Sequence, residues 1–499
     1  MRVVHKTDGD NGEMRLQGLI ALFLCALTAT AQTTGTIHNA EPSVGVSASV
    51  PAAIDTITAQ KLRGHVSFLA SDLLEGRDSP SRGLDVAAEY IAAQFRALNL
   101  EPLGDNGFFQ TMNWTLMEAP AAGTTLEIDG TAVDAKHFRT TAGGGIDAEG
   151  EVVELRSGDI AGKIVRLESA KRNVIADAIP FVRNAQPKIV LIPDEADTLK
   201  ASGVFQPRAI ITADTPARGA YVYVILTGPA AALVATARTV RFHMPPALES
   251  AARVWNVAGL LRGSDAALAP TAVVVSAHYD HEGVRPENAG DKIMNGANDD
   301  ASGTAVLLET ARALAAMPTK PTRSIVFLAV AAEEKGLLGS LYYAKHPLWP
   351  LENTVANLNF EMFGRTEEGE YTRPGQMTMT GAGFSTVTEV VKQAAADEGL
   401  KFFIHPQGNE EFFGRSDNFA FAKEGIPAHT ITPGFSFAQY HQVGDEWQTL
   451  DYDNMQRAAR AAALATFRLA DSAEAPQWDV SNESVKKYAD RRAVPASAK

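Results

Sequence analysis

The spacing of apolar residues changes along this chain, and each change marks a segment of different structure. Residues 58–74 and 83–100 place apolar residues three and four positions apart, which predicts two amphipathic helices. Residues 115–250 contain short β-like runs, such as GKIVRL and PKIVLIP, broken by Gly, Pro and Asp, and only residues 230–238 favour a helix. The pattern therefore predicts a helical lead-in followed by a β-rich insertion.

From residue 251 onwards, strand patterns alternate with helix patterns. TAVVVSAHYD, SIVFLAVAAEE and VANLNFEMFG are nearly continuous apolar runs, and residues 302–316 and 337–345 between them favour helices. Strands without polar alternation are typical of a sheet that helices cover on both faces. We predict an α/β fold, a three-layer sandwich with a largely parallel (mixed) central sheet, plus the smaller β-rich inserted domain.

Composition and spacing also divide the chain into segments. We predict a signal peptide at residues 1–31, a linker at 32–55, the first helices of the α/β domain at 56–114, the β-rich insertion at 115–250, the main part of the α/β domain at 251–475 and a C-terminal tail at 476–499.

The start of the chain has the pattern of an export signal. Arg15 precedes an apolar run at residues 18–27, and the Ala-Thr-Ala of residues 29–31 predicts cleavage before Gln32. The apolar run is too short to cross a bilayer, which takes about 20 residues. We expect a protein that is exported to the periplasm or secreted, without stable membrane insertion.

The one cysteine of the chain, Cys25, lies inside this apolar run. A mature protein without cysteine forms no disulfide and folds safely in an oxidising compartment. The true start of the protein is either Met1 or Met14, which directly precedes the positive charge of the signal.

The charge balance excludes one class of partner. The 499 residues carry a net charge of −14, and the sequence pI is near 5.3. A nucleic-acid-binding protein would normally present a basic face, so we expect no nucleic acid as a partner. The oligomeric state does not follow from these properties.

Acidic and imidazole side chains follow three of the predicted strands. TAVVVSAHYD ends on His278 and Asp280, SIVFLAVAAEE ends on Glu333 and Glu334, and VANLNFEMFG ends near Glu361. In open α/β sheets the ligand crevice lies outside the carboxyl ends of the strands. We therefore expect these side chains to lie close together.

Asp299 and Asp300, in NGANDDASG, and His441, in AQYHQVGDEW, are candidates for the same crevice. Each residue alone has an ordinary explanation, because an Asp before a helix commonly caps it. Together they need another explanation, since carboxylates packed side by side must protonate or find a cation. Mixed His and carboxylate ligands favour zinc, cobalt or manganese over calcium or magnesium.

Five segments, AHYDHEG, NGANDDASGTAVLLE, AAEEKGLLGS, NFEMFGR and YHQVGDE, resemble in order and spacing the motifs of the co-catalytic di-zinc aminopeptidases. These zinc exopeptidases include bacterial leucyl aminopeptidases and are related to glutamate carboxypeptidases and glutaminyl cyclases. The resemblance covers residues 251–470, and residues 65–102 resemble the lead-in helices of larger bacterial members. The insertion resembles a protease-associated domain through its placement and the segment GDIAGKIVRL.

The resemblance implies two zinc ions per chain, with Co2+ or Mn2+ as possible replacements. In that pattern His278 and Glu361 hold one ion, Glu334 and His441 hold the other, and Asp299 bridges the two. The family most often has Asp at the position of Glu361, so this ligand departs from the usual pattern.

The resemblance also implies roles for the neighbouring residues. Glu333 would be the general base that accepts a proton from the attacking water, and Asp280 would accept a hydrogen bond from the His278 ring and orient it. The peptide bond between Asp299 and Asp300 is cis in relatives, and we expect the same here.

Three more residues are candidates for substrate contacts. Tyr440 precedes His441 and is a possible oxyanion helper, and Arg415 and Asp417 either position the substrate or support a loop. Among the other histidines, His281 is a candidate for the mouth of the site, and we expect His429 to be structural.

The sequence thus favours an exported, zinc-dependent aminopeptidase that acts on peptides with a free N-terminus, with apolar or bulky first residues preferred. Three alternatives stay open on this fold: carboxypeptidase action on acidic C-termini, cyclisation of N-terminal glutamine, and a non-catalytic peptide-binding or receptor module. The presence of Glu333 together with every candidate ligand favours the aminopeptidase.

Overall fold

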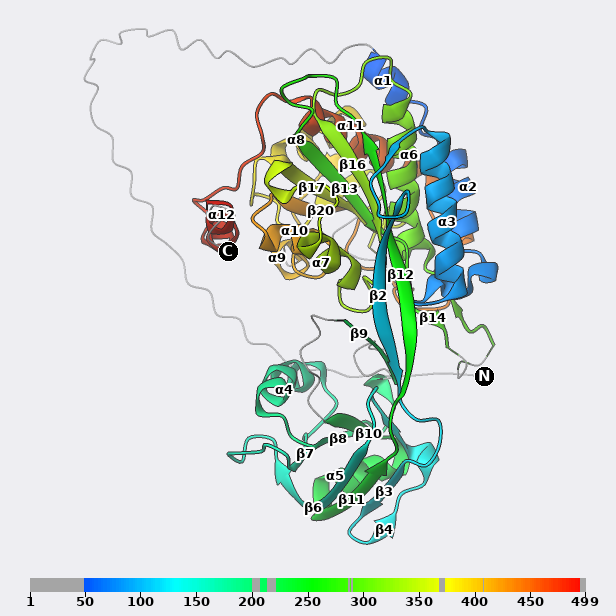
Figure 1. The fold of residues 1–499 in the computed structure, drawn as a ribbon, viewed down its shortest axis with the longest axis vertical. Coiled ribbons are helices and arrows are strands. Elements are labelled where there is room, and N and C mark those ends of the chain that lie inside the picture. The colour runs from blue at the N-terminus through cyan, green and yellow to red at the C-terminus, as the bar shows by residue number, and fades with distance from the viewer. Residues whose placement is uncertain are drawn as a thin grey trace, which may run out of the picture. The chain divides into compact units, whose positions relative to one another are not determined.

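The computed structural model describes residues 49–199, 207–212, 221–285, 288, 290–367, 373–406 and 408–493. The predicted signal peptide and most of the predicted linker lie outside these residues. Residues Ser47–Lys499 form one compact unit. Figure 1 shows its two large sheets, one of ten strands and one of eight.

The ten-stranded sheet has a parallel centre and antiparallel edges. Its central strands β16, β13, β17 and β20 run parallel, whereas β12 pairs antiparallel with β16 and β18 pairs antiparallel with β20. In order, the strands are β19 (Lys401–Phe402), β18 (Gln376–Met379), β20 (Ala428–Thr432), β17 (Thr354–Phe360), β13 (Ala272–His278), β16 (Ser324–Val330), β12 (Leu248–Leu261), β2 (Phe109–Glu118) and β9 (Arg208–Ile211), with β1 (Glu101–Pro102) on β12.

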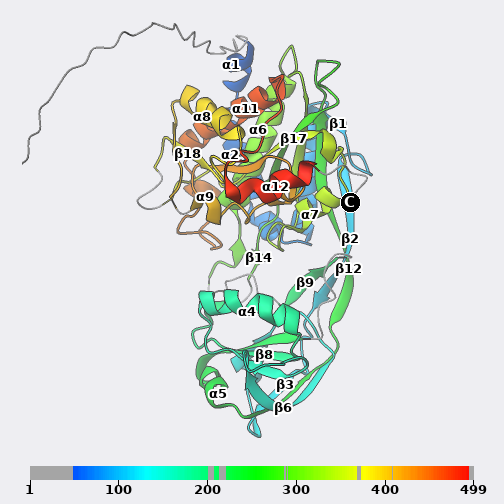
Figure 2. The same cartoon turned by 90° about the vertical axis from the view of Figure 1, so that its left-hand side faces the viewer.

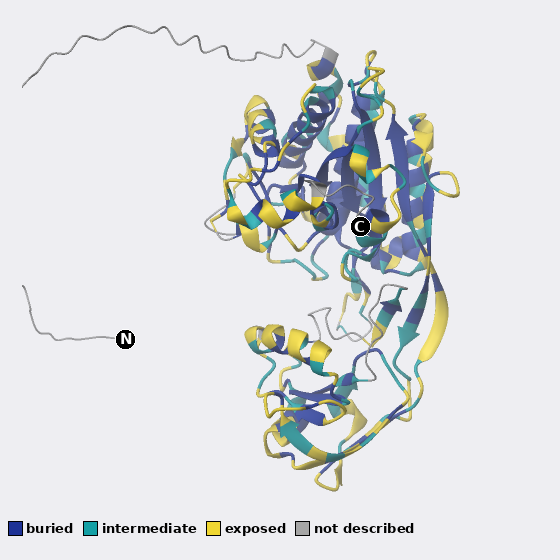
Figure 3. Ribbon diagram, turned by 60° about the vertical axis from the view of Figure 1, so that its left-hand side comes forward, coloured by how far each residue is buried: buried dark blue, intermediate teal, exposed yellow. Residues whose placement is uncertain are grey.

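The sequence of the central strands explains their position in the sheet. Every residue of β13, β16 and β17 is buried, as expected for strands with apolar side chains on both faces. In Figure 3 these strands are dark blue along their whole length. The mixed central sheet and the α/β class that the sequence predicts are confirmed, and the parallel pairs lie mainly at the centre of the sheet.

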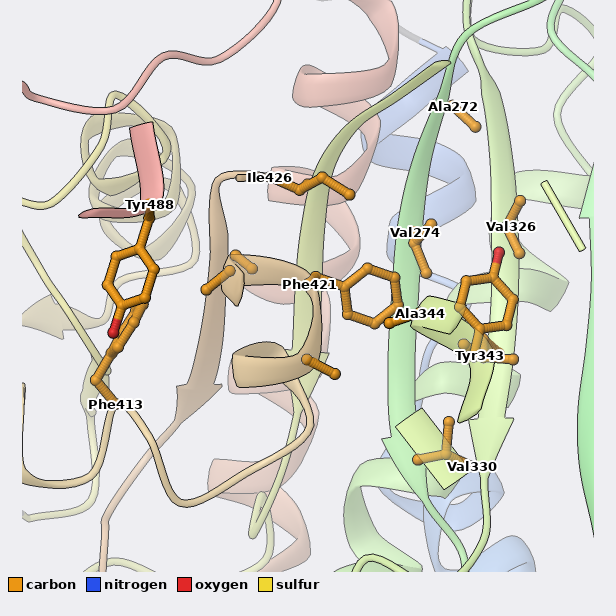
Figure 4. Close-up of a cluster of buried hydrophobic side chains, with 14 of the residues drawn as sticks. Ala272, Val274, Val326, Val330, Tyr343, Ala344, Phe413, Phe421, Ile426 and Tyr488 are labelled. Carbon is orange, nitrogen blue, oxygen red and sulfur yellow. The ribbon is translucent and has the colours of Figure 1, made fainter. Parts of the chain in front are cut away.

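Helices cover both faces of this sheet (Figures 1 and 2). One layer contains α1 (Ser49–Ile54), α2 (Ala59–Leu69), α3 (Arg82–Ala97), α6 (Gly303–Ala315), α8 (Val387–Asp397) and α11 (Tyr452–Asp471). The other contains α7 (Leu338–Lys345), α10 (Asn418–Lys423) and α12 (Glu483–Ala493), with α9 (Gly408–Glu411) nearby. Figure 4 shows the apolar core on this second side, where Phe421 and Tyr343 pack over Val274 and Val326.

The two lead-in helices begin at residues that satisfy their first backbone donors. The hydroxyl of Thr58 accepts a hydrogen bond from the Lys61 amide, and that of Ser81 accepts one from the Leu84 amide. Ser and Thr are favoured at this position because their oxygen replaces a missing intrahelical acceptor. The helices that the sequence predicts here are confirmed.

A second sheet lies between β2 and β12 in the sequence. Its strands, in order, are β4 (Thr131–Ala132), β3 (Thr125–Ile128), β11 (Thr239–Met244), β6 (Ile146–Glu154), β7 (Ile164–Arg166), β8 (Ile189–Pro193), β10 (Val222–Leu226) and β5 (Phe138–Thr140). Glu118 at the end of β2 pairs with Leu248 at the start of β12, so this segment leaves and returns through adjacent strand ends. Such a placement lets a domain be inserted without disturbing the sheet. The exact boundaries stay a prediction.

Three segments differ from the sequence prediction. The insertion contains α4 (Arg172–Ala185) as well as α5 (Ala231–Thr236), although only the second was expected. Pro180 inside α4 argues against a helix, but Ile175, Ala178 and Val182 bury one face of it. The last residues of the predicted linker form α1, and part of the predicted tail forms α12, because apolar side chains such as Ile54 and Tyr488 are buried there. Among the described residues, no helix is long and apolar enough to cross a membrane.

His429 in β20 gives a testable link between burial and stability. Its Nδ1 lies 2.9 Å from the Thr380 carbonyl oxygen and its Nε2 lies 2.6 Å from the Ser385 hydroxyl, so a neutral ring donates to one and accepts from the other. Burial lowers the pKa of His429 to about 4.

Because the unfolded chain gains this proton near its ordinary pKa and the folded protein does not, the contribution is present above that pKa and is lost as pH falls towards 4. We expect the free energy of unfolding to fall by about 2 kcal/mol more between pH 7 and pH 5 in the native protein than in His429→Gln. Urea unfolding at both pH values measures this difference. Parallel pH dependences of the two proteins would show that His429 is not held neutral.

Candidate metal centre

Three strand ends meet at one edge of the central sheet. β13 ends on His278, β16 leads into Glu333 and Glu334, and β17 leads into Glu361. The backbone turns sharply after the last two strands, with positive φ at Ala332 and Met362. Non-glycine residues in this region cluster at functional sites, because only a surrounding structure that fixes them keeps them there.

The loop after β13 brings Asp299 to the same edge. It ends in the short helical turn η5 (Ala297–Ser302), which leads into α6, and its Asp299–Asp300 peptide bond is cis, as the resemblance implies. The carboxylate of Asp445 accepts hydrogen bonds from the amides of Asn298 (2.9 Å) and Asp299 (3.0 Å). The chain around Asp445 therefore holds the Asp299 loop in place.

Asp299 lies between the two candidate histidine ligands. Its Oδ1 is 3.2 Å from Nε2 of His278, and its Oδ2 is 3.1 Å from Nε2 of His441. The same His441 atom is 3.3 Å from Oε2 of Glu334. Donor atoms at about 2.0–2.2 Å from one tetrahedral ion are separated by about 3.3 Å, so these distances suit shared coordination.

Glu361 completes the first half of the centre. One ligand atom each from His278, Asp299 and Glu361 lie within 4.8 Å of one another. Two further groups meet the same criterion: His281, Asp299 and Glu334, and Glu282, Glu334 and His441. The structure thus brings all five predicted ligands together and adds His281 and Glu282 to them.

Several of these ligand atoms lack hydrogen-bond partners, which suits the binding of a divalent cation. Nε2 of His278 and His441, Oδ2 of Asp299 and Oε1 of Glu334 are buried and have no hydrogen-bond partner among the described residues. Buried polar groups are normally satisfied, because an unpaired one costs about 1–3 kcal/mol. A cation bound between these nitrogen and oxygen atoms would give each of them a partner.

The raised pKa values of His278 and His441 also indicate a site for positive charge. Burial alone would lower the pKa of His441, but Glu334 and Asp299 raise it to about 11. Burial would also lower the pKa of His278, yet Asp280 and Asp299 raise it well above its ordinary value. Without a cation, protons on these rings therefore balance the carboxylates, and a metal would replace these protons because a ligating imidazole is neutral.

The carboxylates divide into two groups. Burial and Glu334 would raise the pKa of Asp299, but the nearby His278 and His441 rings hold it below its ordinary value. His441 likewise lowers the pKa of Glu334 against the effect of burial. Burial raises the pKa of Glu361 to about 7 and that of Glu333 well above its ordinary value. Glu361 and Glu333 are therefore harder to ionise than Asp299 and Glu334.

Asp280 supports Glu333 as well as His278. The ring Nδ1 of His278 lies 3.2 Å from the backbone carbonyl of Asp280 and 3.7 Å from its carboxylate, so the shorter contact is to the main chain, not to the side chain as predicted. The carboxylate accepts hydrogen bonds from the Glu333 amide (3.1 Å) and the Ser79 hydroxyl (3.2 Å). Asp280 thus fixes the turn that presents Glu333.

Asp300 has a different function from its neighbour Asp299. Its Oδ1 accepts hydrogen bonds from the amides of Gly303 and Met362, both at 2.9 Å. The first caps α6, and the second ties the loop to the turn after Glu361. The two adjacent acids therefore combine a candidate ligand with a structural cap.

Sequence reasoning missed several residues that hold this centre. Arg77 is buried, and its guanidinium donates hydrogen bonds to the carbonyls of Tyr279 (2.8 Å), Asn295 (2.7 Å) and Gly296 (2.9 Å). It lies in the segment LEGRDSPSRG, where a basic side chain among turn residues gives no sign of burial. His281 was expected at the mouth of the site, but its ring is fully buried.

The three residues that were predicted to contact substrate lie in different surroundings. The Tyr440 ring stacks on His441 at 4.0 Å between centroids. Asp417 is fully buried, while Arg415 is exposed and covers the Phe412 ring. Their roles stay predictions.

Comparison with known proteins agrees with this geometry. The family profile of "Peptidase family M28" matches residues 256–466, which include every candidate ligand. We call residues 256–466 the M28 region after this match. Aminopeptidase YwaD of Bacillus subtilis (strain 168) is 30% identical over 214 residues, which cover 42% of this chain and 43% of the relative.

Other relatives extend the comparison with this M28 region. Leupeptin-inactivating enzyme 1 of Streptomyces exfoliatus is 30% identical over 160 residues, 32% of this chain and 34% of that protein. The match thus spans less than half the length of both curated relatives. Among solved structures, the aminopeptidase from Aneurinibacillus sp. strain AM-1 has a TM-score of 0.62 at 22% identity and covers 85% of this chain and 96% of its own. The zinc aminopeptidase BSAP from Bacillus subtilis has a TM-score of 0.56 at 21% identity, over 83% and 96% of the two chains. At this identity the two structures show the shared fold.

The two adjacent acids of the M28 region allow a matched test. We expect Asp299→Asn to weaken zinc binding by more than about 100-fold, because Asp299 contacts candidate ligands on both sides. Asp300→Asn keeps the Oδ1 acceptor and should stay within about tenfold of the native protein. Zinc titration against a chromophoric chelator measures both constants. Native-like zinc binding by Asp299→Asn would contradict the central position of this residue.

Proposed function

We propose that this chain is an exported, zinc-dependent aminopeptidase that removes the N-terminal residue of peptides. The observation that carries this proposal is the convergence of Asp299 with two histidines and two further carboxylates, directly beside Glu333. The match of residues 256–466 to a peptidase family and the similarity to aminopeptidases support it.

The proposal assigns two zinc ions to this centre. His278 and Glu361 would hold one ion, Glu334 and His441 the other, and Asp299 would hold both. Zinc is supported by relatives that are named zinc metalloproteases, and the mixed His and carboxylate donors also suit cobalt or manganese.

When bound, such ions would supply Lewis-acid chemistry: they would polarise a scissile carbonyl and lower the pKa of a bound water molecule. A carboxylate oxygen of Glu333 accepts the proton of the attacking water and then donates it to the leaving amine. Glu333 suits this role because burial raises its pKa, so it returns the proton readily, and because it belongs to none of the three ligand groups. Asp280 keeps it in place through its backbone amide.

The surroundings of the site favour exopeptidase action on apolar residues. Several buried acids would attract the ammonium group of a free substrate N-terminus. Phe437 lies 6.0 Å from the Tyr440 ring, which itself stacks on His441, and this aromatic row offers an apolar wall for a bulky first side chain. Burial raises the pKa of Tyr440 well above its ordinary value, so its hydroxyl keeps its proton and can donate to a developing oxyanion.

Two parts of the proposal rest on sequence alone. The apolar run at residues 18–27 and the cleavage pattern before Gln32 support export to the periplasm or beyond. The insertion between β2 and β12 is proposed to be a protease-associated-like domain, on its placement in the chain. N-terminal sequencing of the mature protein tests the cleavage position.

The activity itself is tested with aminoacyl-p-nitroanilides on the zinc-loaded protein. We expect hydrolysis of leucyl or phenylalanyl substrates, its loss after treatment with a strong chelator, and its return on adding zinc. The N-acetylated forms of the same substrates should resist, because they lack the free amine. Release from the acetylated substrates alone, or from none of the panel, would refute an aminopeptidase.

The role of Glu333 is tested by Glu333→Gln, which keeps the size of the side chain and removes the base. We expect kcat to fall by about 10²–10⁴-fold while both zinc ions remain bound, since Glu333 is no ligand. Glu389→Gln, on the exposed face of α8, is the matched control and should keep native turnover. A parallel loss of zinc in Glu333→Gln would mean that this residue binds metal instead.

A further inference from the structure

His281 and Glu282 directly follow Asp280, and both side chains face ligands of the second zinc position. The His281 ring is fully buried, and the Glu282 side chain is only 6% exposed. Neither residue takes part in the reaction proposed above. Their shortest contacts in the centre are nevertheless with Glu334 and His441, which would bind the second ion alone, while His281 is 4.0 Å from the shared Asp299.

Glu282 lies against the nitrogen of His441 that faces away from the centre. Nε2 of His441 is directed at Asp299 and Glu334, which leaves Nδ1 on the far side of the ring. Oε1 of Glu282 lies 3.6 Å from Nδ1, within ion-pair distance, and Arg285 holds the other oxygen of Glu282 at 2.5 Å. Metal-bound histidines usually donate their second N–H to such a partner, which fixes the ring and raises its basicity.

His281 lies against the oxygen of Glu334 that faces away from His441. Its Nδ1 is 2.8 Å from Oε1 of Glu334, while Oε2 of the same carboxylate faces His441. The ring cannot easily move, because Gly296 packs directly on it: a Cβ on Gly296 would lie 2.4 Å from the His281 Cγ. The His281 amide also donates to the Arg77 carbonyl at 3.2 Å.

The first zinc position has different supports. His278 contacts the backbone carbonyl of Asp280, and the Glu361 carboxylate lies 3.4 Å from the side-chain amide of Asn359. Among the described residues, neither His281 nor Glu282 makes a hydrogen bond or ion pair with His278 or Glu361, and only His281 approaches the shared Asp299, at 4.0 Å. The two halves of the centre are therefore braced by separate side chains.

We propose that His281 and Glu282 are positioning residues for the second zinc ion: His281 fixes the Glu334 carboxylate, and Glu282, anchored by Arg285, fixes the His441 ring. This inference rests on the proposed two-zinc function. His281 and Glu282 would support the second ion and not the first, and their role differs from that of the general base Glu333.

The test is a zinc titration of the full-length protein against competing chelators, with Glu282→Gln and His281→Phe compared with the native chain. We expect one of the two dissociation constants to rise by about 10–100-fold in each variant, with the other unchanged, and kcat at limiting zinc to follow the weaker site. Glu282→Asp should restore part of the affinity, and Glu389→Gln is the matched surface control. Circular dichroism of the metal-free variants checks the fold.

Background variants identify the ion that is affected. In a His441→Ala background Glu282→Gln should have no further effect on the remaining ion, because the ring through which it acts is gone. In a His278→Ala background it should still weaken the remaining ion by about 10–100-fold. Unchanged constants in both single variants, or equal weakening of both ions, would overturn the proposal. A native chain that binds fewer than two ions would instead refute the proposed function, and the inference with it.

Discussion

Asp299, buried at one edge of the central sheet, lies close to the half-buried Glu334 and Glu361 and beside a fourth acid, Glu333. Carboxylates so close together cannot all remain ionised without positive charge nearby. The rest of the site follows from this constraint. The nearby carboxylates raise the pKa of His278 and His441, so the protonated imidazole rings can carry the balancing positive charge. A pair of divalent cations would supply it without the protons and leave the imidazoles free to coordinate.

The fold places these groups close together, although they lie far apart in the sequence. Parallel strands align their carboxyl ends, so β13, β16 and β17 each deliver one part of the centre. Buried polar side chains then hold the loops: Arg77 donates hydrogen bonds to four backbone carbonyls, and Asp445 accepts hydrogen bonds from two amides of the Asp299 loop. These backbone contacts explain how strained turns can persist where the chemistry needs them.

The sequence was informative where a residue's chemistry conflicts with its surroundings. The apolar runs predicted the parallel strands at the centre of the sheet. The His, Asp and Glu residues at the ends of these strands predicted the edge where the candidate ligands lie, because a buried charged group is costly unless it is paired or binds a cation. The same logic could not find Arg77 or Asp445, whose partners are backbone atoms that carry no sequence signal. It also missed α4, since Pro180 obscured a buried helical face, and it placed His281 at the mouth because one residue cannot reveal which way its ring turns.

The most direct measurement is X-ray diffraction from crystals grown with zinc, with anomalous data collected at the zinc absorption edge. The account predicts two peaks of similar height, about 3.5–4 Å apart, one on each side of the Asp299 carboxylate, with His278 beside one and His441 beside the other. A single peak, or none within coordination distance of Asp299, would contradict it.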